Sequence, residues 1–309
     1  MSISTVSTLA SVPLRHFALF FLLLLPLAGQ PANHPVRELA PGVYEWQGDR
    51  DQREPANATW IVFKDYVFLI DANFPWGARE IVPAIKKTTD KPIRYVFNTH
   101  YHGDHSFGNS IYSGLGATII CTEACANEMK TKGAASWANW NNPQHSLEGA
   151  RLQPAAITFS DRLIFDDGTQ RVELIRLGPS HSKGDGVAYL PNQKIVVTGD
   201  LCVTWAFGNN VGDADGNYDN WLRALDEMAN WEPKVVVPGH GPISDRSALL
   251  ADRDYLADMM KQVKAGMQAG KTADQLTTEV NLSSHGTIAG DATANATSVR
   301  AMYKRFSAK

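Results

Sequence analysis

Residues 100–105 read His100-Tyr101-His102-Gly103-Asp104-His105 and follow the β-rich stretch Ile93-Arg94-Tyr95-Val96-Phe97. Four metal-binding side chains therefore lie within six positions, in the spacing H-x-H-x-D-H. Imidazole nitrogens and carboxylate oxygens are natural ligands of zinc. Such side chains would repel one another, or be buried at a cost, unless they bound a cation. The segment therefore predicts a metal site, with enough ligands for two ions.

The same arrangement recurs after three other predicted strands. The apolar runs 172–177, 195–197 and 235–237 are each followed, within about four residues, by a metal-binding side chain. These side chains are His181, Asp200 and His240. Most of the intervening turns contain Gly or Pro, which fix a loop, and ligands held at strand ends are well preorganised. Four strand ends are therefore expected to contribute to one site.

The rest of the chain alternates between β-rich runs and helical patterns. Strands are predicted at 42–46, 59–63, 66–70, 93–97, 172–177, 187–190, 195–197 and 235–237. Helices are predicted at 77–88, 122–131, 218–230, 247–268, 272–280 and 293–306. This alternation favours an α/β architecture, and the early hairpins favour mixed rather than purely parallel sheets. The segment 133–151 is polar and aromatic, and we expect it to be a loop between ligand motifs.

Composition and charge narrow the class of protein. The chain has 309 residues, of which 44% are hydrophobic and 20% charged, as is usual for a soluble globular protein. The net charge of -3 gives no electrostatic reason to expect nucleic acid or an anionic membrane as a partner. We expect a small-molecule substrate, and the sequence does not indicate an oligomeric state.

The N-terminal segment has the pattern of a targeting signal. Arg15 and His16 precede a 12-residue apolar run, 17–28, which ends in small residues. A membrane-spanning helix needs about 20 apolar residues, so this run predicts a signal peptide over residues 1–30, with an uncleaved anchor as the alternative. The mature protein would then be periplasmic or secreted, without membrane contact. It would consist of one domain, 31–309, with a core at about 40–245 and a helical extension at 247–309.

Three cysteines are present: Cys121, Cys125 and Cys202. Export permits disulfides without requiring them. We expect all three to be small buried side chains.

In its metal-binding residues the sequence resembles the metallo-β-lactamase superfamily. The matching elements are His100-x-His102-x-Asp104-His105, His181, Asp200 and His240, in that order, and the resemblance covers about residues 40–245. It implies a four-layer αββα sandwich of two mixed β-sheets, with helices outside, C-terminal helices beyond the core, and metals at one edge.

The resemblance also implies a ligand set for two zinc ions. One ion would be held by His100, His102 and His181, and the other by Asp104, His105 and His240. Asp200 would bridge both ions, and Asp71 would support the ligands from behind, a role that metal-bound histidines usually need filled.

Two zinc ions about 3.5–4 Å apart can share a water and lower its pKa towards about 7. The resulting hydroxide would attack a carbonyl carbon, and Asp104 would orient it and shuttle its proton. The expected reaction is hydrolysis of a β-lactam, lactone, ester or thioester.

The substrate is less well indicated. Well-known zinc β-lactamases have a cysteine at the position of Asp200 and a lysine at that of Val203, so penicillin-type hydrolysis is in doubt. Candidate substrate contacts are Lys183, Trp137, Trp140 and Trp205, with Phe207 beside the last. For the tryptophans, packing onto the sandwich surface is the equal alternative, and Lys183 is more typical of a solvated loop residue. His145 is the weakest candidate for an extra ligand.

Three alternatives remain open. A glyoxalase II-like thioesterase shares the ligands, but residues 247–309 do not match its glutathione-binding pattern. An iron-dependent oxidoreductase, similar to sulfur dioxygenases or flavodiiron proteins, shares the fold, although the complete ligand set favours zinc. A non-catalytic metal-binding protein is the third.

Residues 213–219 invite comparison with a calcium-binding loop. The comparison fails, because the sixth position is Tyr218 instead of Gly and the twelfth is Ala224 instead of Glu. We interpret this segment as a loop that caps the helix beginning at 218.

Overall fold

The computed structural model describes residue 1 and residues 34–49, 56–141, 147, 149–205, 209, 211–213, 215–290 and 292–308. Residues 34–309 belong to one compact unit. The predicted signal peptide, His145 and Phe207 fall outside the described residues, apart from Met1.

A seven-stranded mixed sheet forms the N-terminal half. Its strands, in spatial as well as sequence order, are β1 (Val36–Ala40), β2 (Val43–Trp46), β3 (Ala58–Val62), β4 (Val67–Ile70), β5 (Ile93–Phe97), β6 (Thr118–Thr122) and β7 (Ile157–Phe159). β1 to β4 pair antiparallel, and β4 to β7 pair parallel. Because β4 and β5 are parallel, their carboxyl ends, which carry Asp71 and His100, meet at the same edge.

A five-stranded sheet follows. Its strands are β8 (Arg162–Asp166), β9 (Arg171–Arg176), β10 (Gly186–Leu190), β11 (Ile195–Val197) and β12 (Val235–Val237), in the order β12-β11-β10-β9-β8. The pairs are antiparallel except β11 with β12, which is parallel. That parallel pair brings the turns after β11 and β12, which carry Asp200 and His240, side by side.

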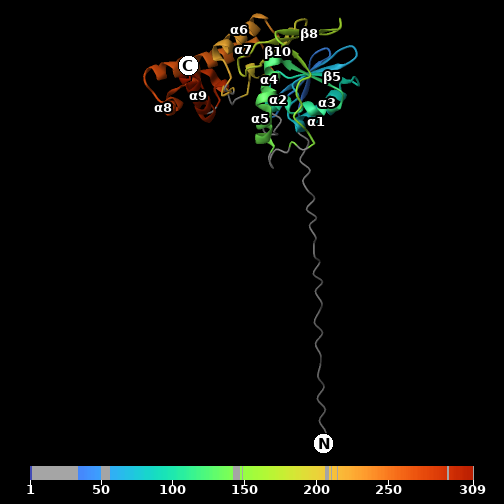
Figure 1. Ribbon diagram of the computed structural model, residues 1–309, viewed down its shortest axis with the longest axis horizontal. Coiled ribbons are helices and arrows are strands. Elements are labelled where there is room, and N and C mark those ends of the chain that lie inside the picture. The colour runs from blue at the N-terminus through green and yellow to red at the C-terminus, as the bar shows by residue number, and fades with distance from the viewer. Residues whose placement is uncertain are drawn as a thin grey trace. The chain divides into compact units, whose positions relative to one another are not determined.

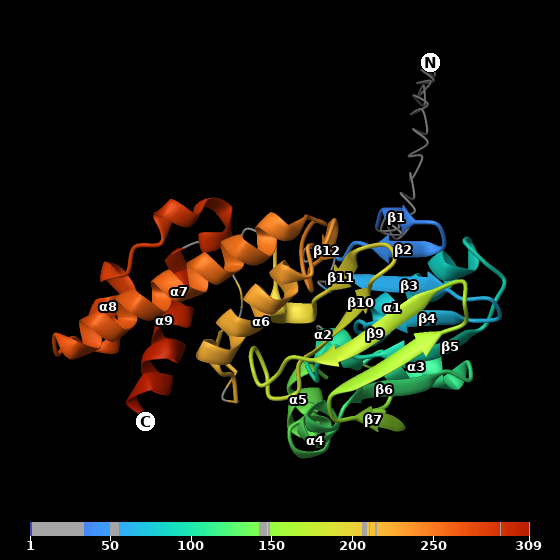
Figure 2. The same cartoon turned by 90° about the horizontal axis from the view of Figure 1, so that it is seen from above.

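Helices lie outside the two sheets (Figure 1). They are α1 (Pro75–Lys86), α2 (Gly103–Ser106), α3 (Asn109–Gly114), α4 (Glu123–Thr131), α5 (Gly133–Trp140), α6 (Tyr218–Asn230), α7 (Arg246–Gln268), α8 (Ala273–Glu279) and α9 (Ala292–Ser307), with 3-10 turns η1 (Gly199–Leu201) and η2 (Ser283–Ala289). Figure 2 shows α8 and α9 packed around α7, away from the seven-stranded sheet.

Three apolar clusters separate these layers. One lies between the sheets and includes Phe68 and Phe97 from the first sheet and Leu174 from the second. Another packs α1 onto the outside of the first sheet. The third packs α6, α7 and α9 onto the outside of the second. The predicted αββα sandwich with C-terminal helices is therefore confirmed.

The helix α6 illustrates how the sequence produces these layers. Its buried residues recur at helical spacing, from Tyr218 and Trp221 to Leu225 and Met228. Its N-terminus is capped by Asn217, whose side chain accepts a hydrogen bond from the backbone of Asn220. The predicted capping of this helix by the preceding loop thus holds through Asn217.

Some elements differ from the sequence predictions. Residues 133–140, expected to be loop, form the helix α5, and the alanines among them are good helix formers. The edge strand β8, which the patterns did not reveal, alternates between exposed and half-buried residues. All three cysteines are buried thiols, as expected. No helix among the described residues is long and apolar enough to cross a membrane.

Candidate metal centre

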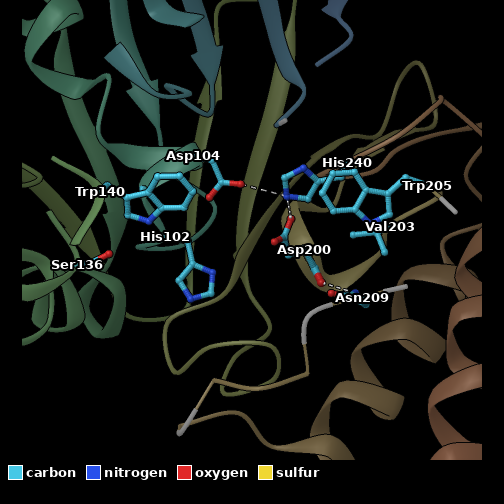
Figure 3. Close-up of a pocket in the computed structure, with 10 residues that line it drawn as sticks. His102, Asp104, Ser136, Trp140, Asp200, Val203, Trp205, Asn209 and His240 are labelled. Atoms are coloured by element: carbon cyan, nitrogen blue, oxygen red, sulfur yellow. Dashed lines mark hydrogen bonds and ion pairs between the residues drawn. The ribbon is translucent and has the colours of Figure 1, made fainter. Parts of the chain in front are cut away.

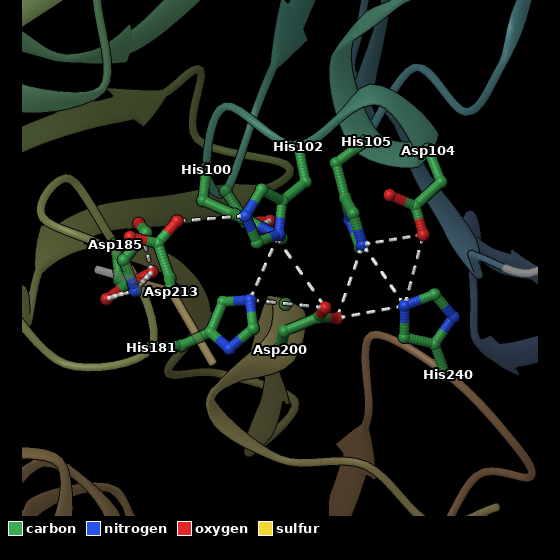
Figure 4. Close-up of polar contacts among 12 residues, drawn as sticks. His100, His102, Asp104, His105, His181, Asp185, Asp200, Asp213 and His240 are labelled. Atoms are coloured by element: carbon green, nitrogen blue, oxygen red, sulfur yellow. Dashed lines mark hydrogen bonds and ion pairs between the residues drawn. The ribbon is translucent and has the colours of Figure 1, made fainter. Parts of the chain in front are cut away.

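The seven predicted ligands converge at one edge of the sandwich (Figure 4). The first metal-binding group comprises His100, His102, His181 and Asp200, whose ligand atoms all lie within 4.8 Å of one another. The second metal-binding group comprises Asp104, His105 and His240, under the same limit. The structure thus divides the histidines and Asp104 between two groups of side chains, which is consistent with a site for two ions.

Asp200 reaches both groups with different oxygens. Its Oδ1 lies 3.2 Å from the Nε2 atoms of both His105 and His240. Its Oδ2 lies 3.5 Å from His181 Nε2 and 3.8 Å from His100 Nε2. The turn that carries it approaches Gly239 so closely that a Cβ at position 239 would collide with Asp200 Oδ1. Asp200 therefore stands where a ligand shared by two ions would stand.

The arrangement of ring nitrogens fits cations better than it fits hydrogen bonds. His102 Nδ1 and His181 Nε2 are 3.1 Å apart, and His105 Nε2 and His240 Nε2 are 3.4 Å apart. His100 Nε2 is buried and has no hydrogen-bond partner among the described residues. Converging imidazole lone pairs with shared carboxylates are a donor set for zinc or a similar divalent ion.

Asp71 fixes two of these histidines from behind. It follows β4 and adopts a φ of 62°, a left-handed conformation that Asp tolerates better than most residues. His105 Nδ1 lies 2.8 Å from Asp71 Oδ2, and the Thr99 hydroxyl lies 2.9 Å from the same oxygen and 3.1 Å from His100 Nδ1. These contacts leave the Nε2 atoms of His100 and His105 to face the metal centre.

Asp213 plays the corresponding part for His102, and sequence reasoning missed it. Its Oδ2 accepts hydrogen bonds from His102 Nε2 at 3.1 Å and from the Tyr101 hydroxyl at 2.7 Å. His102 therefore presents Nδ1, rather than Nε2, to the first group. No motif links Asp213 to His102, which lies 111 positions earlier, and only the folded loop before α6 brings them together.

Asp213 belongs to an ionic cluster centred on Lys132. Lys132 Nζ lies 2.8 Å from Glu128 Oε1, 3.2 Å from Asp213 Oδ1 and 2.8 Å from Asp215 Oδ2. These three carboxylates could hold a metal by spacing alone, but the lysine ammonium already supplies the positive charge. Glu128 also accepts a hydrogen bond from the backbone of Gly184 at 3.0 Å, which ties α4 to the His181 loop.

The charge environment differs between the two groups. Burial lowers the pKa of His181 to about 4, and it also holds the pKa of His100 well below its usual value, with neighbouring histidines adding to the effect. Burial opposes protonation of His105 and His240 as well, but Asp200 and other carboxylates raise their pKa values above the ordinary one. The histidines of the second group are thus surrounded by more negative charge.

A cavity of about 280 Å³ opens onto the metal centre. Its walls include His102, Asp104, Asp200 and His240, together with Ser136, Trp140, Val203, Trp205 and Asn209 (Figure 3). Of the predicted substrate contacts, Trp140 and Trp205 therefore line the cavity. Trp137 instead packs on Phe107, with ring centroids 4.9 Å apart, and the exposed Lys183 is absent from the walls.

Comparison with known proteins gives a consistent set of relatives. The sequence profile of the Metallo-beta-lactamase superfamily matches residues 51–240. The chain is 25% identical over 246 residues to a linear primary-alkylsulfatase from Pseudomonas sp. (strain ATCC 19151), covering 67% of this chain and 46% of the relative. It is 26% identical over 208 residues to a metallo-beta-lactamase type 2 from Bacillus sp. (strain 170), covering 65% and 73%.

Among solved structures, a sec-alkylsulfatase from Pseudomonas sp. superposes with a TM-score of 0.70 at 19% identity, over 88% of this chain and 50% of that chain. At this identity the likeness concerns the fold alone. This chain spans about half the length of either alkylsulfatase.

Proposed function

The chain belongs to the metallo-beta-lactamase superfamily and has two groups of metal-binding residues, and we propose that it is a dinuclear zinc hydrolase that acts on a carbonyl substrate. The substrate classes in question are β-lactams, lactones, esters and thioesters. The observation that carries the proposal is the position of Asp200, with one oxygen directed to each group.

Two bound metal ions would supply Lewis-acid activation of a water molecule and of the scissile carbonyl. The chain's own residues orient the reaction. Asp104 lines the cavity, and its Oδ2 lies 3.3 Å from His240 Nε2. Its side chain is 20% exposed, so a substrate can reach it. A carboxylate at this place can accept a proton from the attacking water and return it to the leaving group.

Elemental analysis of the purified protein tests the metal assignment. We expect about two zinc ions per chain. About one iron ion per chain would instead support an oxidoreductase of the sulfur dioxygenase-like kind and overturn the proposal. A panel of β-lactam, lactone, ester, thioester and sulfate-ester reporters then identifies the scissile bond.

Asp104→Ala tests the role of the cavity carboxylate. We expect loss of turnover with every substrate in the panel, because proton transfer contributes roughly a hundredfold or more and Asp104 also belongs to the second group. Asp161→Ala, which removes an exposed carboxylate next to β8, is the matched control and should keep the parent rate. A wild-type rate in Asp104→Ala would remove Asp104 from the mechanism.

We further propose that the protein is exported, on the evidence of the apolar run 17–28 after Arg15. Cell fractionation followed by N-terminal sequencing tests this. A mature chain that begins near residue 30 outside the cytoplasm is expected, and a cytoplasmic chain that still contains residues 1–30 would contradict it.

A further inference from the structure

We propose that the substrate carries an uncharged apolar group away from its scissile bond, and that this group is held between the indole rings of Trp140 and Trp205. The inference rests on the proposed function, since it concerns the cavity of the same metal centre. The substrate would then be recognised through an acyl chain or an aromatic ring rather than through a carboxylate.

The two indoles stand on different sides of the reactive residues. Trp140 is the last residue of α5, and Trp205 follows the turn that carries Asp200. Figure 3 shows Trp140 beside Asp104 and Trp205 beside His240. Both rings line the cavity of about 280 Å³. A group projecting from a carbonyl bound at the metal centre would therefore meet an indole on either side.

Packing from behind sets the position of each indole. Trp205 stacks on His240, with ring centroids 4.2 Å apart and planes 14° apart. Trp140 packs on the buried ring of Phe74, with centroids 4.6 Å apart, yet it keeps 37% of its surface exposed. Aromatic surfaces that are fixed before binding lose little conformational entropy when a ligand arrives.

Away from the metal centre, the described residues of the cavity offer no cationic side chain to a substrate anion. Its lining residues include neither Lys nor Arg, and the only acidic ones are Asp104 and Asp200. Lys132, next to α5, already contacts three carboxylates. A substrate carboxylate held between the indoles, away from the metal centre, would lose its water without gaining an ionic side-chain partner, which is costly.

The remaining polar groups suit a neutral ligand. Ser136 and Asn209 line the cavity and carry uncharged hydrogen-bonding groups. The Ser136 hydroxyl can donate to an ester or amide oxygen of the substrate without requiring charge, whereas the Asn209 amide already donates to the backbone oxygen of Asp200. Each methylene transferred from water into an apolar site favours binding by a factor of about four, from roughly 0.8 kcal/mol per methylene. Chain length and terminal charge are therefore the variables to test.

The experiment uses the zinc-loaded protein and aryl esters of straight-chain acids from acetate upward. We expect kcat/KM to rise about fourfold per methylene until the cavity is filled. Esters of equal length that end in a carboxylate should react at least about tenfold more slowly. Equal rates for all chain lengths, or faster reaction of the carboxylate series, would overturn the inference.

Variants assign the effect to the two indoles. Trp140→Ala and Trp205→Ala should each flatten the dependence of kcat/KM on chain length, and Trp140→Phe should restore part of it. Trp137→Ala is the matched control, because Trp137 lies on the same helix but outside the cavity, and it should keep the full dependence. The same flattening in Trp137→Ala would assign the effect to the packing of α5 and overturn the inference.

A binding measurement separates this inference from the proposed function. Uncleavable amides of the same acids, with and without the terminal carboxylate, are titrated into the protein by calorimetry. If no ester, lactone, thioester or β-lactam is hydrolysed, the proposed function fails. The inference fails separately if the neutral amides do not bind more tightly than the carboxylate-bearing ones.

Discussion

The two metal-binding groups share Asp200 but differ in the charge around them. In the first group three histidines face Asp200, with Asp213 behind His102, and the pKa values of His100 and His181 lie below the ordinary value. In the second group Asp71, Asp104 and Asp200 surround His105, and the pKa values of His105 and His240 are raised. Two ions bound here would therefore experience different local charge, although they share one bridging residue.

The residues that support the two groups also differ in protonation. Asp213 supports His102 in the first group, and hydrogen bonds from His102, Tyr101 and the backbone of Asp215 outweigh its burial and hold its pKa well below the ordinary range. Asp252, from α7, accepts a hydrogen bond from the backbone of Val203 at 3.1 Å. Val203 in turn forms a bridge with His240. Burial raises the pKa of Asp252 to about 7.

The largest expected effect is an opposite pH dependence of stability at these two carboxylates. The folded-state pKa of Asp252 lies above its ordinary value of 3.8, at about 7. The folded protein therefore binds this proton more tightly than the unfolded chain, and the stability it contributes is lost as pH rises from about 4 to about 7. The rise in the pKa of Asp252 from 3.8 to about 7 corresponds to a loss in the free energy of unfolding on the order of 4 kcal/mol. Asp213 behaves in the opposite way: its contribution is present above its ordinary pKa and is lost as pH falls below it.

Urea denaturation of the metal-free protein between about pH 2 and pH 8 measures both effects, that of Asp252 above about pH 4 and that of Asp213 below it. Asp252→Asn should flatten the fall in stability towards neutral pH. Asp213→Asn should destabilise at neutral pH, and its deficit should shrink at the acidic end of the range. Parallel curves for wild type and Asp252→Asn would show that Asp252 does not titrate in this range.

A smaller effect should distinguish the metal affinities of the two groups. Asp213 fixes the ring of His102, at 3.1 Å. Asp71 contacts His105 directly, at 2.8 Å, and reaches His100 of the first group only through the Thr99 hydroxyl. Loss of such a supporting carboxylate typically weakens metal binding about tenfold to a hundredfold. Asp213→Asn should weaken one of the two binding steps, and Asp71→Asn should weaken chiefly the other.

Calorimetric titration with zinc, repeated with cobalt to follow its absorption spectrum, measures both steps. Asp161→Asn, an exposed carboxylate, serves as the control and should leave both unchanged. If the groups are separate, the double variant should show the sum of the two effects. An equal weakening of both steps by each single variant would mean that the groups act as one site.

The ligands could be predicted from the sequence because their position depends on a simple rule. Each follows an apolar run, and strands that neighbour one another in a sheet deliver their ends to one edge. The parallel pair β11 and β12 does so for Asp200 and His240. The spacing H-x-H-x-D-H places His100, His102, Asp104 and His105 in one short segment after β5, and His181 follows β9. The alternation of strands and helices indicated an α/β fold with mixed sheets, and the resemblance of the ligand motifs to the superfamily implied the four-layer sandwich.

The supporting residues could not be predicted in this way. Asp213 and Lys132 lie in a loop and at a helix junction, and their contact spans 81 positions without any periodic pattern. Asp252 lies on the buried side of α7 among apolar residues, where sequence alone suggests only core packing. The Asn and Trp residues of α5 are typical of a polar, aromatic loop, whereas its alanines favour a helix. Long-range polar contacts of this kind are decided by the packed structure.

The smallest expected effect concerns Lys132, which contacts the support of the first group but not of the second. Lys132→Met keeps the aliphatic stem and removes the charge that lies 3.2 Å from Asp213. Asp213 still receives hydrogen bonds from Tyr101, His102 and the backbone of Asp215. The affinity of the first group should therefore fall by less than about tenfold, while the second stays unchanged.

Lys130→Met removes an exposed lysine of α4 and controls for the change in net charge. Lys132→Arg should recover most of the loss in affinity. The comparison with Asp213→Asn decides what Lys132 contributes. A loss as large as that of Asp213→Asn would mean that Asp213 cannot hold His102 without the lysine. A loss in both groups would mean that the charge of Lys132 acts on the whole centre rather than through Asp213, and the distinction between the two supports would then no longer hold.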